Sequence, residues 1–288
     1  MPLNKDDIYT KIAAPDMLDY GVYLNVDQLL QCQKPTDALC NGDELQFQIV
    51  HQVEELWMKL MAYTLVDIDA AMQAREDMKA LTLFGRVHVI QRLMITQMDL
   101  LETMSPRDYQ EVRLQLGNGS GQESPGFQLL LTLPPELWKT YQQHYLAGRS
   151  VREVYDTGFT HDAAYKLGEA MVEYDELFQK FRAMHIYLIH RTIGMGAASL
   201  KGRPVELLNA GTRHRFFPEL WDVRWQMTDA WGGTYGKHRP SISDDVADAG
   251  PDAGTDAAPD AALAGQHSGH GSPTGMPLQA ELPDKGAK

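Results

Sequence analysis

The sequence predicts an all-α protein, in which one helical bundle is followed by a disordered tail. Three observations support this class. Through the longest segments, apolar residues recur at every third or fourth position, which is the spacing of a helix with one buried face. Clear strand alternation is absent. Hydrophobic residues make up 43% of the 288-residue chain, which is enough for a sizeable core. We therefore expect one domain over residues 1–240 and a disordered, acidic tail rich in Ala, Gly and Pro over residues 241–288.

The first three helices are predicted between residues 43 and 121. One covers residues 43–75 and carries an apolar row on one side, made of Leu45, Ile49, Val53, Leu56 and Leu60. Another covers residues 79–103. A third begins at Ser105 and Pro106, because serine can cap a helix and proline fits its first turn. The glycine-rich residues 116–121 must end it.

Three more helices are predicted after this break. A short helix opens at Pro134 and runs toward Leu146. The longest covers residues 161–193, and a loop with glycine and proline follows over residues 194–204. The last helix opens at Pro218.

Composition excludes several classes of function. A net charge of −13 argues against a nucleic-acid binder or a protein that binds anionic membranes, because both need a basic field. The chain has no apolar run of about 18 residues, so no membrane span is expected. The N-terminus carries no apolar signal core. Cys32 and Cys40 are too few for a disulfide framework, which indicates reduced thiols in a cytoplasmic protein.

Two histidines are the leading candidates for chemistry. His185 belongs to an apolar row at helical spacing that includes Phe181 and Leu188, and a buried imidazole needs a partner. That partner is either a hydrogen-bonding group of the core or a metal ion. His51 lies on another helix with Glu54 and Glu55 close in sequence, so it could also be half of an imidazole–carboxylate pair.

Among metal sites, haem is the easiest to satisfy. A carboxylate di-iron bundle needs two Glu-x-x-His pairs, but Gln48 and Arg182 stand three residues before the two histidines. The His-Glu-x-x-His zinc motif is also absent. Haem requires only one neutral imidazole below the iron and a shaped pocket above it.

Two further groups have the chemistry to bind a ligand. Tyr109 and Arg113 are four residues apart, so they share one helix face, and the arginine fork matches a carboxylate. A surface salt bridge to Asp108 or Glu111 is the alternative for this arginine. Near the N-terminus, Tyr20 and Tyr23 can be packing anchors or can line an aromatic pocket.

Taken together, these stretches resemble the tryptophan 2,3-dioxygenase family of haem enzymes, which insert both oxygen atoms of O2 across the indole C2–C3 bond. The resemblance runs from about residue 20 to residue 224. It is strongest over residues 20–30, which begin Tyr-Gly-Val-Tyr-Leu, over residues 43–57, which end His-Gln-Val-Glu-Glu-Leu-Trp, and over residues 216–224, Phe-Phe-Pro-Glu-Leu-Trp-Asp-Val-Arg. It implies a haem pocket in the bundle, one haem b per subunit, an aromatic amino acid such as L-tryptophan and O2 as substrates, and a homotetramer.

The resemblance also implies roles for individual residues. His185 corresponds to the axial haem ligand, and His51 to the distal histidine that receives the indole N–H. Phe47 corresponds to the wall of the substrate pocket, and Arg113 with Tyr109 to the carboxylate clamp. The remaining positions are Ser120 and Gly121 in the loop over the haem, Ser199 near the substrate ammonium, and Tyr20, Tyr23 and Leu24 in a segment that reaches a neighbouring subunit's pocket.

The chain departs from the family pattern in two loops. Residues 122–126 read Gln-Glu-Ser-Pro-Gly where the family has Phe-Gln-Ser, and residues 196–204 replace a loop richer in glycine and serine. These changes favour an alternative within enzymes, a haem-dependent hydroxylase of a substituted indole or another aromatic amino acid. A third interpretation is a haem-binding sensor without catalysis.

Overall fold

The computed structural model describes residues 18–117, 119, 121–157, 161–196 and 209–231, together with Lys5 and Ile8. Within these ranges every regular element is helical, which confirms the all-α prediction. The chain divides into two units, residues 1–235 and 236–288. The second unit and the predicted boundary at residue 240 lie outside the described residues.

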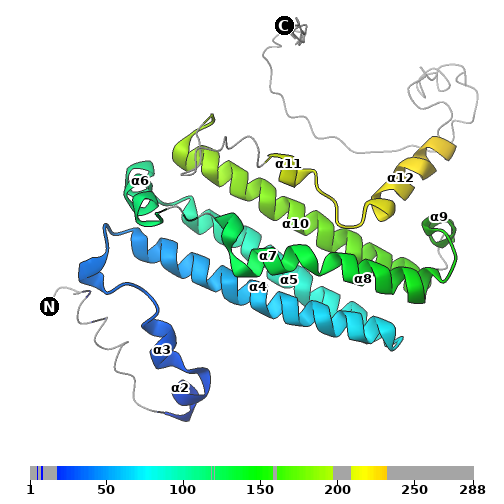
Figure 1. Ribbon diagram of the computed structural model, residues 1–288, viewed down its shortest axis with the longest axis horizontal. Helices are drawn as coiled ribbons and strands as arrows, with labels where there is room; N and C mark the ends of the chain where they lie inside the picture. The colour runs from blue at the N-terminus through cyan, green and yellow to red at the C-terminus, as the bar shows by residue number, and fades with distance from the viewer. Residues whose placement is uncertain are drawn as a thin grey trace, which may run out of the picture. The chain divides into compact units, whose positions relative to one another are not determined.

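Three long helices form the centre of the bundle. They are α4 (Glu44–Gln73), α5 (Asp77–Leu101) and α10 (Ala163–Ile193), and α5 packs along both of the others (Figure 1). Each was predicted with ends within a few residues. Because α4 and α10 are held side by side by α5, side chains far apart in sequence meet between them.

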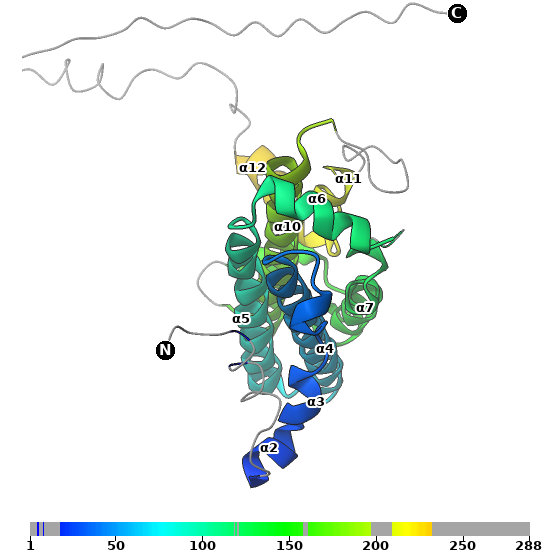
Figure 2. The ribbon, with the colours of Figure 1, turned by 90° about the vertical axis from the view of Figure 1, so that its left-hand side faces the viewer.

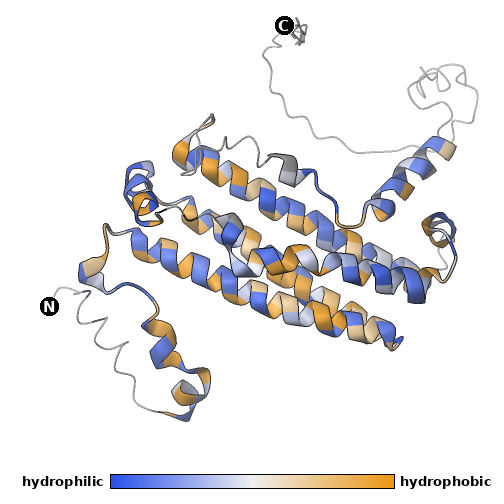
Figure 3. Cartoon of the chain, viewed as in Figure 1, coloured by the Kyte–Doolittle hydropathy of each residue, from blue (hydrophilic) through white to orange (hydrophobic). Residues whose placement is uncertain are grey.

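The apolar rows predicted on α10 and α4 differ in their burial. On α10 the row that surrounds His185 is buried, as the helical period requires: Leu167, Met171, Tyr174, Phe178, Phe181, Leu188 and Thr192. On α4 the row from Leu45 to Leu60 instead faces outward, and Leu56 is 49% exposed. The buried face of α4 carries Val50, Met58, Met61, Leu65 and Ile68. Figure 3 shows apolar residues on the outer surface of this helix as well as inside the bundle.

Shorter helices cover the gap between α4 and α10. Helix α6 (Pro106–Gln115) contacts both, and the Ser105 side chain accepts from the Asp108 N–H, as predicted for a cap. Helices α7 (Pro125–Thr132) and α8 (Pro134–Tyr141) pack against α4 on another side (Figure 2). Helix α7 was not predicted from the sequence.

The C-terminal described segment is tied to α10 by one carboxylate. Helix α12 (Pro218–Trp231) packs on α9 (Val151–Tyr155) and on α10, and the short α11 (Asn209–Thr212) lies against α10. Asp175 on α10 is fully buried and accepts from the backbone N–H groups of Phe216 and Phe217 and from Trp221 Nε1. The segment before α12 is therefore fixed to the bundle through hydrogen bonds as well as apolar packing.

Helices α2 (Asp19–Leu24) and α3 (Val26–Leu30) precede the bundle and bury none of their residues. The connection to α4 is anchored by side chains, since Gln33 donates to Gln52 and the Lys34 N–H donates to Gln48. Of the helices described, none is long and apolar enough to cross a membrane.

Candidate functional site

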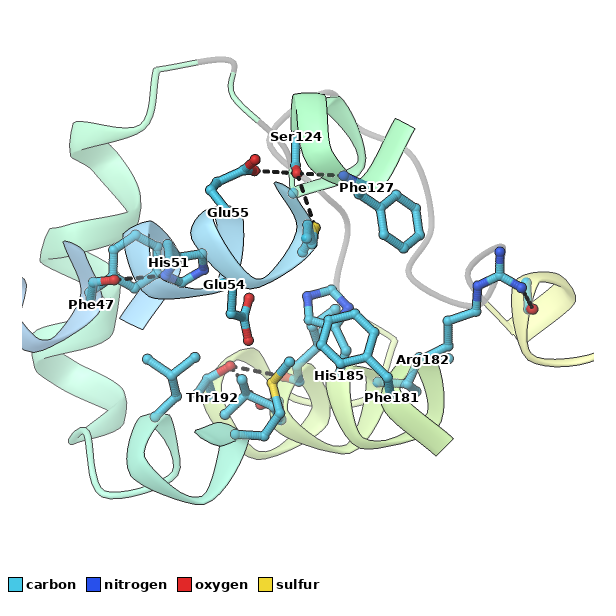
Figure 4. Close-up of a pocket in the computed structure, with 18 of the residues that line it drawn as sticks. Phe47, His51, Glu54, Glu55, Ser124, Phe127, Phe181, Arg182, His185 and Thr192 are labelled. Atoms are coloured by element: carbon cyan, nitrogen blue, oxygen red, sulfur yellow. Dashed lines mark hydrogen bonds between the residues drawn. The ribbon is translucent and has the colours of Figure 1, made fainter. Parts of the chain in front are cut away.

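A cavity of about 430 Å³ lies between α4 and α10 at the end covered by α6 and α7 (Figure 4). This volume falls in the range of small-molecule and cofactor sites. Most of its wall is apolar, built from methionine, leucine, isoleucine and phenylalanine side chains of α4, α5, α7 and α10. Into this apolar space project a few polar groups, among them His51, Glu54 and His185.

The imidazole of His185 enters the cavity from α10. Burial, together with a smaller contribution from the nearby His51, lowers the pKa of His185 to about 4. The ring is therefore neutral near pH 7 and keeps a nitrogen lone pair. Among the described residues no hydrogen-bond partner for this ring is found, so the hydrogen-bonded core histidine is the weaker interpretation. The arrangement leaves the lone pair available to a ligand in the cavity.

His51 faces the same cavity from α4, and its tautomer follows from its hydrogen bond. Its Nδ1 lies 2.7 Å from the Phe47 carbonyl oxygen, which can only accept, so Nδ1 carries the proton. Nε2 is then an acceptor. Burial lowers the pKa of His51, opposed by the bond to Phe47 and by the charge of Glu55. No ion pair joins His51 to either neighbouring glutamate in the described part of the chain.

An aromatic wall adjoins His51. The ring centroids of Phe47 and His51 are 4.0 Å apart, and those of Phe47 and Tyr109 are 6.3 Å apart. Burial raises the pKa of Tyr109, and the charge of Arg113 lowers it in part. Arg113 is half-buried, but it does not belong to the described lining of the cavity. The structure thus brings Phe47, His51, Tyr109 and His185 together, and leaves Arg113 outside this set.

The other predicted positions divide into three groups. Gly121, at the start of the 3-10 turn Gly121–Glu123, lines the cavity. Ser120 and Ser199 lie outside the described residues. The side chains of the α2 segment point away from this chain's own cavity, with Tyr20 75%, Tyr23 88% and Leu24 44% exposed.

The altered residues 122–126 are built into the cavity wall through Glu55. Its carboxylate accepts from the Ser124 hydroxyl and, at 3.0 Å, from the Gly126 N–H. Ser124 Oγ in turn accepts from the Phe127 N–H and caps α7. A Cβ at Gly126 would lie 2.7 Å from the Cβ of Met58, so the close approach of α7 to α4 requires glycine there. This segment therefore forms an ordered start to α7, and Ser124 belongs to the cavity lining.

Glu54 is the functional candidate that sequence reasoning did not single out. It is only 6% exposed, lines the cavity, and its Oε1 has no hydrogen-bond partner among the described residues. Burial, together with a smaller contribution from the charge of Glu55, raises the pKa of this carboxyl to about 7. The signal in the sequence was its spacing, because a residue three after His51 lies on the same helix face.

The fold and the site define a class: an all-helical protein with an apolar cavity into which two helices each project a histidine that is neutral near pH 7. Comparison with known proteins narrows this class. The family model for tryptophan 2,3-dioxygenase matches residues 10–146. A tryptophan 2,3-dioxygenase of Myxococcus xanthus is 30% identical over an aligned length of 282 residues. The match covers 79% of this chain and 96% of that protein. The chain belongs to the tryptophan 2,3-dioxygenase family.

Two further relatives show the same relationship over nearly their whole length. The tryptophan 2,3-dioxygenase of Serratia proteamaculans is 28% identical, with 78% of this chain and 99% of that protein covered. That of Rhodococcus jostii is 28% identical, with 77% and 95% covered. At this identity the chain is a divergent member, and its own reaction and substrate have to be argued from its site.

Proposed function

We propose that this protein is a haem-dependent dioxygenase that inserts O2 across the indole C2–C3 bond of L-tryptophan or a close analogue, giving an N-formylkynurenine-type product. The observation that carries the proposal is the neutral, unpartnered imidazole of His185 in an apolar cavity that it shares with His51. Family membership supports it, because the enzymes of this family are haem-dependent.

The residues of the cavity fit haem b, with one group per subunit. The described residues contain no cluster of three or more metal-binding side chains, but a porphyrin supplies four ligands and leaves one to the protein. His185 would be that ligand, and Gly121 would lie near the porphyrin, as would Ser120, which is outside the described residues. When bound, the iron would supply the capacity to bind and activate O2. The apolar walls, including Phe181 and Ile186, would exclude water.

The polar groups at the α4–α6 end would orient the amino acid. His51 Nε2 would accept the indole N–H, and the Phe47 ring would form the wall against which the indole packs. Arg113, which lies one helical turn after Tyr109 on α6, would bind the substrate carboxylate. A guanidinium–carboxylate pair of this kind rejects analogues without the carboxylate. Ser199 would complete the site near the ammonium.

We also propose a cytoplasmic homotetramer. Support for assembly comes from apolar surface that a single chain leaves open: Tyr20, Tyr23 and Leu24 on α2 and the outward row of α4. Exposed apolar patches of this extent mark interaction sites. In the assembly, the α2 residues would reach a neighbouring subunit's cavity. Both cysteines are free thiols, which is usual in a reducing compartment.

A haem-dependent hydroxylase is the second candidate, and Glu54 is the observation that favours it. A hydroxylase consumes O2, two electrons from an external reductant and two protons, and it releases one oxygen atom as water. It therefore needs a proton donor near the reacting atoms, and the pKa of Glu54 is raised to about 7 by burial. A dioxygenase retains both oxygen atoms and has no such need.

Turnover under ¹⁸O2 separates the candidates. The haem-loaded protein is incubated with L-tryptophan, and the product is analysed by absorbance and mass spectrometry. The proposal expects an N-formylkynurenine chromophore and incorporation of both labelled atoms. One labelled atom, with consumption of a reductant, would replace the proposal with the hydroxylase. A haem protein that binds L-tryptophan without any product would indicate a sensor.

A further inference from the structure

Glu54 is an unsatisfied acid inside the cavity. Its side chain is 6% exposed, and no donor reaches Oε1. Figure 4 shows the carboxyl extending from α4 toward α10, in the space bounded by His51, Thr192 and His185. The group thus points at the volume that a ligand would occupy.

The neighbouring groups already have other partners. The Thr192 hydroxyl donates to the Leu188 carbonyl of its own helix, and His51 uses its only N–H on Phe47. Arg182 also lines the cavity, but its guanidinium donates to the Gly211 carbonyl and lies 4.7 Å from the Phe178 ring centroid. Nothing on the described walls therefore satisfies the Glu54 oxygen.

This arrangement costs folding free energy. A buried polar group without a partner destabilises the folded state, and a carboxylate does so more than a neutral group. An apolar residue at the same position would avoid that cost and pack against the apolar walls. The carboxyl is explained if a bound molecule supplies the missing donor.

We propose that Glu54 is a substrate-binding residue whose carboxyl oxygen accepts a second O–H or N–H donor of the bound aromatic amino acid, so that the site selects substrates that carry this donor. The inference deepens the proposed function and rests on it. His51 Nε2 takes one donor, the indole N–H. The donor for Glu54 is then either a hydroxyl or amino substituent on the ring, or the α-ammonium.

The spacing on α4 supports two separate acceptors. Residues three apart on a helix are neighbours on one face, with about 5–6 Å between their Cβ atoms. His51 and Glu54 are thus two acceptors on adjacent positions of the same wall, both opposite α10. A ligand with one donor satisfies only one of them, whereas a ligand with two donors satisfies both.

The test measures ligand affinity, which does not require turnover. The ferric haem-loaded protein is titrated with each ligand, and the dissociation constant is read from the shift of the haem absorption band. One arm uses tryptophans hydroxylated at each position of the benzene ring and their methyl ethers, which keep the oxygen but lose the O–H. The other arm compares L-tryptophan with indole-3-propionate, which lacks the ammonium.

The variants are Glu54→Leu, which removes the acceptor, and Glu54→Gln, which keeps one acceptor oxygen. Glu54→Leu should lower the affinity for the ligand that carries the donor about tenfold or more. The affinity for the matched ligand without the donor should change less than about threefold. If only one hydroxytryptophan loses affinity relative to its methyl ether, the donor is a ring hydroxyl. If L-tryptophan loses affinity relative to indole-3-propionate, the donor is the ammonium. Glu54→Gln should recover part of the affinity.

Thr64→Val is the matched control. Thr64 is a buried polar residue of the same helix whose hydroxyl is bonded to the Leu60 carbonyl, away from the cavity. It should leave every affinity ratio unchanged. Equal losses for all ligands in Glu54→Leu, or no loss for any of them, would overturn this inference while the proposed function stands. A wild-type protein that responds to no ligand would overturn both.

Discussion

Glu44 and Glu54 are buried glutamates on the same helix, α4, yet their surroundings are opposite. Glu44 accepts from Lys34 Nζ, from the Cys40 N–H and from Gln48. Glu54 leaves Oε1 without a partner and faces the cavity. Burial would raise the pKa of Glu44, but the bonds from Lys34 and Cys40 outweigh it and lower that pKa, whereas burial raises the pKa of Glu54 to about 7.

Helix α10 shows a similar contrast between an aspartate, Asp175, and a histidine, His185. Asp175 is fully buried and accepts four hydrogen bonds, two from the segment before α12, one from Trp221 in α12 and one from Gln179 in α10 itself. Three turns further along, His185 lines the cavity, with no hydrogen-bond partner among the described residues. The difference indicates that Asp175 holds the fold, whereas Glu54 and His185 face the cavity.

The largest effect on stability is expected at Asp175. In Asp175→Ala, two backbone N–H groups and the Trp221 indole N–H lose their acceptor. Breaking a buried charged network typically costs about 3–5 kcal/mol of the free energy of unfolding. Chemical denaturation measures it, with Asp222→Ala on the exposed side of α12 as the control, expected within about 0.5 kcal/mol of wild type. A loss below about 1 kcal/mol at Asp175 would contradict the structural role.

In the ligand-free protein, replacing Glu54 should stabilise the fold, whereas replacing Asp175 destabilises it. The folded protein holds this proton more tightly than the unfolded chain, whose pKa is near 4.5, so stability falls as pH rises from about 4.5 to about 7. Glu54→Gln removes that loss. The variant should gain on the order of 3 kcal/mol relative to wild type between pH 5 and pH 8. A stability difference that does not change with pH would show that the carboxyl is satisfied.

At Glu44 a smaller effect with the reverse pH dependence is expected. Its folded pKa lies below the unfolded value, so its contribution is present above about pH 4.5 and disappears as pH falls through the folded pKa. Glu44→Gln should cost about 1–3 kcal/mol at pH 7. Denaturation near pH 3 should show a smaller cost, and an equal cost at both pH values would break the contrast with Glu54.

How much the sequence predicts depends on whether a feature is local. The helical period and the Ser105 cap are encoded within a few residues, and these elements are where the sequence predicts them. Helix α7 was not predicted, although it carries the same local signal, in which Ser124 caps the helix and Pro125 fits its first turn. What the local sequence does not show is the long-range anchor, because Glu55, which holds Ser124 and Gly126, lies about seventy residues earlier.

The same limit applies to the site. The sequence identified His185 from its place in an apolar row and His51 as a histidine on a second long helix, and the structure brings both into one cavity. It could not reveal that Glu54 lacks a partner, because that fact depends on every neighbouring side chain. The sequence also could not show that the Leu45–Leu60 row faces outward. An apolar row has the same pattern whether it packs on a core or on another subunit.

The central claim is that His185 is the protein ligand of haem. The direct measurement is the absorption spectrum and haem content of His185→Ala, with His88→Ala as the matched control. His88 is also a buried histidine, but its ring is bonded to the Ala170 carbonyl and lies beside Glu173. His185→Ala is expected to lose stoichiometric haem or its histidine-ligated Soret band, while His88→Ala keeps both. A normal histidine-ligated spectrum in His185→Ala would contradict it.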